Sequence, residues 1–97
     1  MVKLRNWTLC AGGDAFTAPE NRPLCAGGEV DSHPGLSGGG RVLTSPIKHA
    51  RGKFILTQNT TYRLVGPPCE HFVEFVLHKH GLMFNGDIGP IVAYLSS

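Results

Sequence analysis

The stretch HPGLSGGGRVLTS, residues 33–45, holds a histidine, a serine and a run of glycines close together. Gly35 to Gly39 fits the pattern G-x-S-x-G, in which a nucleophilic serine stands on a sharp turn from a strand into a helix. That turn belongs to a large α/β sheet, and the similar serine-protease pattern needs two barrels with a distant histidine and aspartate. This chain has only 97 residues, and a strand-like segment follows the glycines. We therefore expect no catalytic role for Ser37, and a protein that is not an enzyme.

The same glycines look like a phosphate-binding loop, because Gly35–Gly40 are followed by the cation of Arg41. A phosphate loop, however, leads into a helix N-terminus and needs a lysine and a Ser/Thr hydroxyl for magnesium. The glycines here lead into a predicted strand. What remains is a turn whose bare amides can wrap an anion, with His33, Arg41 and Thr44 at its ends as the residues of interest.

Histidines are the other potential ligands, and the chain has five of them. His71 and His78 fall on one face of a predicted helix, with Glu74 between them. Zinc sites normally show tighter spacing, such as H-x-x-x-H or C-x-x-C. Pairing of Glu74 with His78 on an exposed helix face explains the pattern more simply. We predict no metal site and no cofactor.

The charges divide the chain into three parts. Residues 1–31 carry a net charge of −1, residues 32–63 carry +5 without any acid, and residues 64–97 carry −2. The acidic flanks either lie beside the basic middle and neutralise it, or leave it as a surface that faces an anion. The sequence leaves both alternatives open.

Nucleic acid is one anion that the basic middle would suit. Small barrels that bind nucleic acid combine such charges with exposed aromatic side chains on which bases stack. We expect Tyr62 to be this aromatic and Phe54 to be buried. The candidate binding residues, from the glycine-rich turn through the basic strands, are His33, Arg41, Thr44, Lys48, Arg51, Tyr62 and Arg63.

Three cysteines, Cys10, Cys25 and Cys69, are far apart in the sequence and include no C-x-x-C pair. A disulfide framework normally has an even count, so we expect reduced thiols and a cytoplasmic protein. Lys3 and Arg5 are not followed by the apolar run of a signal peptide. No segment approaches the roughly 18 apolar residues of a membrane span, and we expect no membrane partner.

Alternation of apolar and polar residues predicts the strands that would position these side chains. Residues 4–10 place Trp7 and Leu9 on one face, and further strands are predicted at 24–30, 41–50, 53–58 and 61–66. Pro46 lacks an amide donor, so an edge or a bulge is expected within 41–50. The continuous apolar run Phe54–Leu56 suggests burial on both faces of its strand.

The C-terminal third differs in character. Residues 68–80 predict a helix, because Phe72, Val73, Val76 and Leu77 recur at helical spacing and Gly81 follows the last turn. For residues 82–97, Pro90 is compatible with a short final helix or with an edge strand, and the sequence does not separate the two.

These elements predict one domain, residues 1–97, of the α+β class. Thirteen glycines and seven prolines imply many turns and short elements. We expect a small antiparallel β-barrel or curled sheet of about five strands, with one C-terminal helix packed on it.

Residues 24–66 resemble a small, uncharacterised bacterial β-rich family. Its pattern is G-x-V, two residues, His-Pro, a loop, a Thr-Ser pair in the next strand and later Tyr-x-Leu-Gly. The matching positions here are Gly28, Val30, His33, Pro34, Thr44, Ser45, Tyr62 and Leu64. Val65 separates Leu64 from Gly66, and the glycine run replaces the Asp-Gly that the family's loop usually carries. The length and the distinct C-terminal third also resemble the single-domain products of integron gene cassettes. Neither resemblance implies a catalytic role.

A non-catalytic binding module is thus the function that the sequence favours. The apolar segments LMF (82–84) and PIVAYL (90–95) would cover a core or meet a partner, so a homo-oligomer or a protein partner is the first expectation. A binder of nucleic acid or another anionic ligand through the basic 41–63 hairpin is the alternative. A small-molecule hydrolase is the third.

Overall fold

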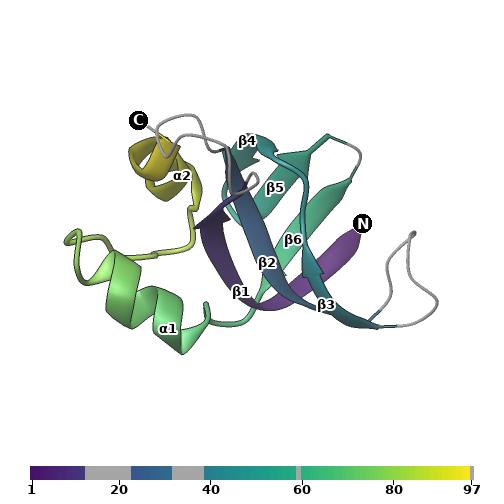
Figure 1. Cartoon of the computed structure of the whole chain (residues 1–97), viewed down its shortest axis with the longest axis horizontal. Helices are drawn as coiled ribbons and strands as arrows, with labels where there is room; N and C mark the ends of the chain where they lie inside the picture. Colours follow the sequence, from purple (N-terminus) through teal and green to yellow (C-terminus); the bar gives the residue numbers. More distant parts are fainter. Residues whose placement is uncertain (13–22, 32–38, 59, 97) are drawn as a thin grey trace.

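The computed structural model describes residues 1–12, 23–31, 39–58 and 60–96. These residues form a small β-rich unit in which one six-stranded mixed sheet is accompanied by two short helical segments (Figure 1). The predicted α+β class is confirmed. The sheet has six strands instead of about five, and a second helix follows the predicted one.

The sheet has the strand order β3-β2-β1-β6-β5-β4. The strands are β1 (Val2–Ala11), β2 (Leu24–Val30), β3 (Gly40–Leu43), β4 (Ile47–Arg51), β5 (Phe54–Thr57) and β6 (Thr61–Val65). The predicted strands at 4–10, 24–30 and 61–66 are confirmed to within a few residues. β6 shows the alternation that one buried face requires, whereas β2 is buried along most of its length.

The expectation of an antiparallel sheet is wrong at the centre of the sheet. β1 and β6 run parallel, with Lys3 opposite Arg63 and Leu4 opposite Leu64. The other four strand pairs are antiparallel. The parallel pair brings the N-terminal strand beside a strand some 60 residues later, which local alternation does not reveal.

The predicted strand 41–50 is two strands, and they lie at opposite edges of the sheet. Only Thr44, Ser45 and Pro46 separate β3 from β4. A flat six-stranded sheet would put its edges roughly 24 Å apart, which is more than the roughly 15 Å that this link can span. The sheet therefore curls, and β2 and β4 come into contact. No ladder of hydrogen bonds joins β3 to β4 in the described part of the chain, so the sheet stays open and no closed barrel forms.

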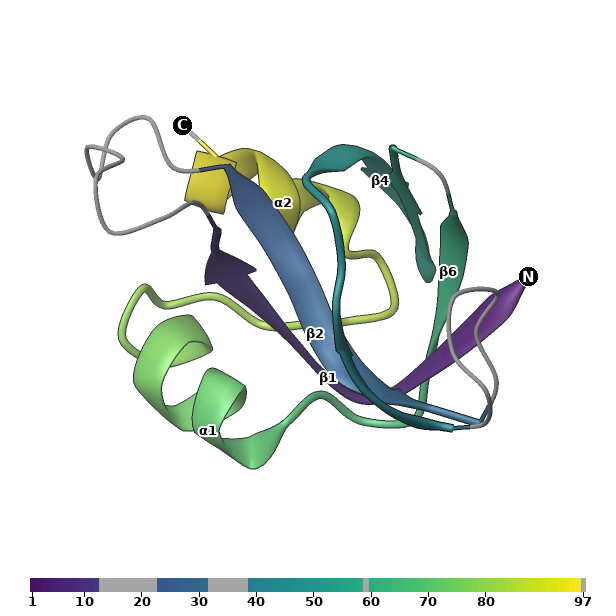
Figure 2. The same cartoon turned by 45° about the vertical axis from the view of Figure 1, so that its right-hand side comes forward.

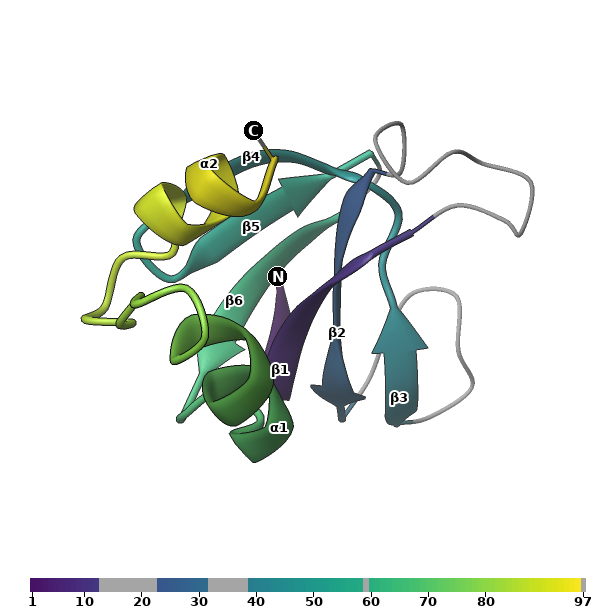
Figure 3. The same ribbon diagram turned by 60° about the vertical axis from the view of Figure 1, so that its left-hand side comes forward.

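The core fills the concave side of this sheet. Leu4, Trp7 and Ile55 are fully buried there. The helical segments cover the same side (Figures 2 and 3) and contribute Phe72, Leu77, Ile88 and Ile91. Trp7 is held by Phe72 and Phe84, at ring-centroid distances of 6.0 and 4.9 Å. Its indole N–H donates to the Gly66 carbonyl at 3.3 Å.

The predicted helix 68–80 is present, but it is not a regular α-helix. A short α1 (Glu70–Phe72) runs into η2 (Val73–Leu77), whose wider π-type turns close through the His78 N–H to the Val73 carbonyl, 2.9 Å. The segment after it contains α2 (Gly89–Ser96), so residues 82–97 hold a helix and not an edge strand. Neither helical segment in the described residues is long and apolar enough to cross a bilayer.

The expectation that β5 is buried on both faces is wrong. Ile55 and Thr57 are buried, whereas Phe54 and Leu56 are 44% and 43% exposed. The run Phe54–Leu56 therefore alternates in burial although it does not alternate in polarity. Its outward members form an apolar strip on the convex side of the sheet, which we call the outer face.

Asp87 links the β4–β5 turn to the start of α2 through hydrogen bonds. Its carboxylate accepts hydrogen bonds from the Gly52 N–H at 2.9 Å and from the Gly89 N–H at 3.0 Å. The Ile88 N–H donates to the Gly52 carbonyl at 2.8 Å. Gly52 has φ = +59°, a conformation that glycine adopts without strain. This turn carries Lys53, so the contact also fixes the backbone at this lysine.

Replacing Asp87 with asparagine is expected to lower the melting temperature at neutral pH. The two amide donors, and after them Arg51, lower the pKa of the Asp87 carboxyl, so the charged form stabilises the fold. That stabilisation is present above the ordinary pKa of an aspartate and is lost as the pH falls through the lowered folded-state pKa. The difference in melting temperature between the wild type and Asp87→Asn should therefore shrink as the pH falls from about 5 toward 2. A constant difference over this range would contradict the role of the charge.

Candidate functional site

The register of the sheet places four residues side by side on the outer face. Lys3 on β1 pairs with Arg63 on β6, Arg63 pairs with Phe54 on β5, and Phe54 pairs with Arg51 on β4. Residues that pair in this way project from the same face. With neighbouring strands about 4.8 Å apart, the four side chains span roughly 15 Å. We call Lys3, Arg63, Phe54 and Arg51 the cross-strand row.

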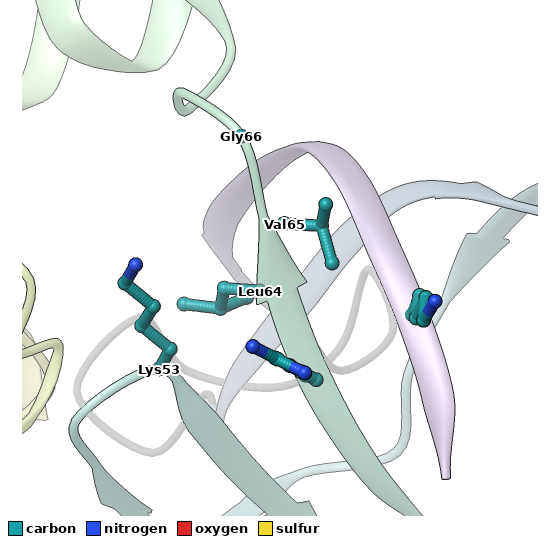
Figure 4. Close-up of a pocket in the computed structure, with 6 residues that line it drawn as sticks. Lys53, Leu64, Val65 and Gly66 are labelled. Atoms are coloured by element: carbon teal, nitrogen blue, oxygen red, sulfur yellow. The ribbon is translucent and has the colours of Figure 1, made fainter.

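Beside this row the surface is hollowed. A depression of about 240 Å³ lies where the β4–β5 turn meets the end of β6 (Figure 4). Its lining is Lys3, Lys53, Arg63, Leu64, Val65 and Gly66. The Leu64 N–H donates to the Lys53 carbonyl at 2.7 Å, which fixes the backbone of the turn against β6. Three cationic residues thus line one small hollow.

The positive charge at this hollow is not neutralised by nearby acids. Within the described residues, its lining contains no carboxylate. The sequence from residue 47 to residue 65, which covers β4, β5 and β6, contains no Asp or Glu. The acidic flanks of the sequence therefore do not neutralise this part of the basic surface. Arg51 is the exception, because Asp87 lies near it.

A second hollow adjoins the first and differs from it in charge. It shares Val65 and Gly66 and is otherwise lined by Arg5, Asn6, Glu29 and Pro67. Arg5 is opposite Glu29 in the sheet and donates to Asp31 at 2.6 Å. Its cation is therefore compensated, and the uncompensated charge is concentrated at Lys3, Lys53 and Arg63.

The outer face also presents apolar surface next to the cations. Phe54 stands between Arg63 and Arg51, and Leu56 pairs with Thr61 and His49 in the next row. A half-exposed phenylalanine flanked by two arginines offers a flat ring to a planar ligand group and two donors to an anion. The row can therefore bind a ligand that is both aromatic and anionic.

The structure brings some of the predicted binding residues together and separates others. Arg51 and Arg63 lie in the cross-strand row, and Lys48 is exposed at the irregular start of β4. Arg41 is on β3, at the other edge of the sheet, paired with Glu29. His33 and the serine of the G-x-S-x-G motif, Ser37, lie outside the described residues, so their predicted roles stay predictions.

Two predicted binding residues are structural. Tyr62 is only 3% exposed and packs in the core, so the expectation that it stacks on a ligand is wrong. Burial raises the pKa of its hydroxyl. Thr44 is buried; its hydroxyl accepts from the Ala26 N–H at 3.0 Å and donates to the Ser45 carbonyl at 2.8 Å. It satisfies backbone groups where the chain passes from β3 to β4.

No family model, curated protein or solved structure matches the chain. The resemblance to a bacterial β-rich family and to integron cassette products stays a prediction. No group of three or more His, Cys, Asp or Glu side chains in the described ranges is placed to hold a metal ion.

Sequence reasoning missed Lys3 and Phe54. Lys3 alternates with the buried Val2 and Leu4, which indicates that it faces outward but not which strand it neighbours. For Phe54, the alternation of Tyr62 and Leu64 with the charged Arg63 supplies a usable signal. A strand that buries Tyr62 presents Arg63 outward. In the neighbouring strand, either Phe54 and Leu56 or Ile55 must then face outward as well.

Proposed function

We propose that the protein is a non-catalytic binding module for single-stranded nucleic acid, and that the outer face is its binding surface. The observation that carries this proposal is the cross-strand row, in which a half-exposed Phe54 lies between cations. Proteins that bind single strands combine a positive groove for the backbone with aromatic rings on which bases stack. The hollow of Lys3, Lys53 and Arg63 supplies the first part, and Phe54 supplies the second.

A single strand fits these features better than a duplex. In a duplex the base faces are stacked on each other and are not accessible to a side chain at the surface, whereas unpaired bases can stack on Phe54. Proteins that recognise a duplex often insert a helix with several cationic side chains into a groove. No helix in the described part of the chain carries such a cluster. The proposal therefore commits to single strands bound largely without sequence preference.

The experiment measures binding of a labelled oligothymidylate of about ten nucleotides by fluorescence anisotropy at several salt concentrations. Contacts with three or four phosphates predict a slope of about −2 to −3 in a plot of log K against log salt. Replacing both Lys53 and Arg63 with alanine should reduce the magnitude of this slope by about 1.4, because each phosphate contact to a single strand contributes about 0.7 to it.

The double variant Arg41→Ala/Lys79→Ala is the matched control. It removes the same charge from exposed positions outside the cross-strand row. The proposal predicts that it leaves the slope nearly unchanged. Equal losses for the two double variants would show that net charge alone drives binding, and no measurable binding by the wild type at low salt would reject the proposal.

Self-association, the first expectation from the sequence, stays the second candidate function. Phe54 and Leu56 form an apolar strip beside β4, which is an edge strand of the sheet in the described residues, and two edge strands can pair. Light scattering of the concentrated protein distinguishes the two functions. A dimer that dissociates when oligonucleotide is added would show that both use the outer face.

A further inference from the structure

Two of the three cysteines lie directly opposite each other in the sheet. Cys10 near the end of β1 pairs with Cys25 at the start of β2, although they are far apart in the sequence. Residues opposite each other in an antiparallel pair project to the same face. We propose that Cys10 and Cys25 are a disulfide-forming pair that can link β1 to β2 covalently.

The backbone spacing suits the bond. The Gly12 N–H donates to the Pro23 carbonyl at 2.7 Å, so Gly12 and Pro23 occupy a hydrogen-bonded position of the ladder, and Cys10 and Cys25 occupy the next one. The Cα atoms of such a pair are about 5.5 Å apart, inside the range of about 4.4–6.8 Å found in disulfides. The Cβ atoms must approach by about 1 Å.

The Cys25 sulfur already lies on the face of the sheet that it shares with Cys10. A Cβ added to Gly12 would lie 2.6 Å from the Cys25 sulfur, so this sulfur packs against the bare backbone of Gly12, on the face that it shares with Cys10. Forming the bond requires a rotation about χ1 that turns this sulfur toward Cys10. Cys25 is nearly inaccessible and Cys10 is half-buried, so an external reagent reaches Cys10 first.

The reaction with glutathione disulfide balances in two exchange steps. The Cys10 thiolate attacks one sulfur of the reagent, which forms a mixed disulfide and releases one glutathione thiolate. The Cys25 thiolate then attacks the Cys10 sulfur, which forms the intramolecular bond and releases the second glutathione. The two protein thiols are oxidised, the reagent is reduced, and the two protons end on the released glutathiones. Burial raises the pKa of both thiols, and for Cys10 the neighbouring Cys25 adds to this effect, so exchange is slow at neutral pH.

The test incubates the folded protein with glutathione disulfide, blocks free thiols and digests with a protease that cleaves after glutamate. Cleavage after Glu20, Glu29 and Glu70 puts Cys10, Cys25 and Cys69 in three different peptides. We expect a linked pair of the peptides 1–20 and 21–29 in the wild type. The variant Cys69→Ser, which leaves the pair intact, should give the same link, and Cys25→Ser should retain glutathione on Cys10.

The same oxidation in concentrated urea provides the reference, because an unfolded chain gives links to Cys69 as well. A folded protein that forms only the Cys10–Cys25 link supports the proposal. Links to the peptide 30–70 that are as abundant as in urea, or glutathione adducts on Cys10 with no link after prolonged incubation, would overturn it.

Discussion

Replacing Phe54 with alanine is expected to weaken binding of a single-stranded oligonucleotide by roughly 5- to 150-fold, because stacking of one base on an aromatic ring contributes about 1–3 kcal/mol. The salt dependence of binding should not change, since Lys3, Lys53 and Arg63 all remain. A weaker affinity with an unchanged salt dependence would distinguish the contribution of the Phe54 ring from that of the cations. The variant Lys53→Ala/Arg63→Ala should reduce the slope, whereas Phe54→Ala should reduce the affinity at every salt concentration.

Phe75→Ala is the matched control for this prediction. Phe75 is 61% exposed, lies on η2, and stacks on His71 at a ring-centroid distance of 5.7 Å. Phe75 is thus exposed like Phe54, but it lies on a helical segment and not on the outer face of the sheet. Binding should be unaffected by Phe75→Ala. A loss for Phe75→Ala as large as that for Phe54→Ala would move the binding surface to the helices.

Replacing Trp7 with alanine should cost about 3–5 kcal/mol of the free energy of unfolding. Trp7 is fully buried, contacts Phe72 and Phe84, and donates to the carbonyl of Gly66. A small domain has about 5–15 kcal/mol in total, so the variant is expected to be partly or wholly unfolded at room temperature. Urea unfolding followed by circular dichroism measures the effect, since the chain's single tryptophan is lost with the substitution.

Trp7→Phe tests which of these contacts matters. It keeps an aromatic ring in the core but loses the N–H bond to Gly66 and some volume. We expect about 1–2 kcal/mol of destabilisation. A Trp7→Ala variant with the stability of the wild type would contradict the packing of Phe72 and Phe84 around this residue, and with it the position of the helical segments on the sheet.

Local patterns in the sequence predict several elements of this fold well. The strand around Trp7 and Leu9, the strand 24–30 and the helical spacing of Phe72 and Leu77 are each visible within ten residues of chain. Alternation is enough to predict the first strand and helical periodicity is enough to predict the helix, whereas the strand 24–30 is buried along most of its length and does not alternate.

The arrangement of the sheet could not be predicted in the same way. Pro46 indicates an interruption within 41–50, but the interruption could equally be a bulge in one strand. That β3 and β4 lie at opposite edges follows from the pairing of β1 with β6, which joins residues about 60 positions apart. Such pairings depend on the whole chain and not on any one segment.

The candidate site likewise combines residues that the local sequence identifies with residues that only the strand pairing brings together. Arg51 and Arg63 are among the binding residues predicted from the sequence, and Lys53 contributes to the net charge of residues 32–63, but Lys3 joins them only through the parallel register with β6. Apolar residues on an outward face mislead a pattern that equates apolar with buried, and Phe54 and Leu56 are of this kind. Functional surfaces often break the rule in this way.

Single-stranded nucleic acid is proposed to bind across the cross-strand row. The most direct test of this binding is a titration of the isotope-labelled protein with oligothymidylate, followed by changes in the amide resonances of the NMR spectrum. The proposal predicts that the largest changes fall on Lys3, Lys53, Phe54 and Arg63, and that α1, η2 and α2 are little affected. Changes confined to the helical segments, or no change at low salt, would contradict it.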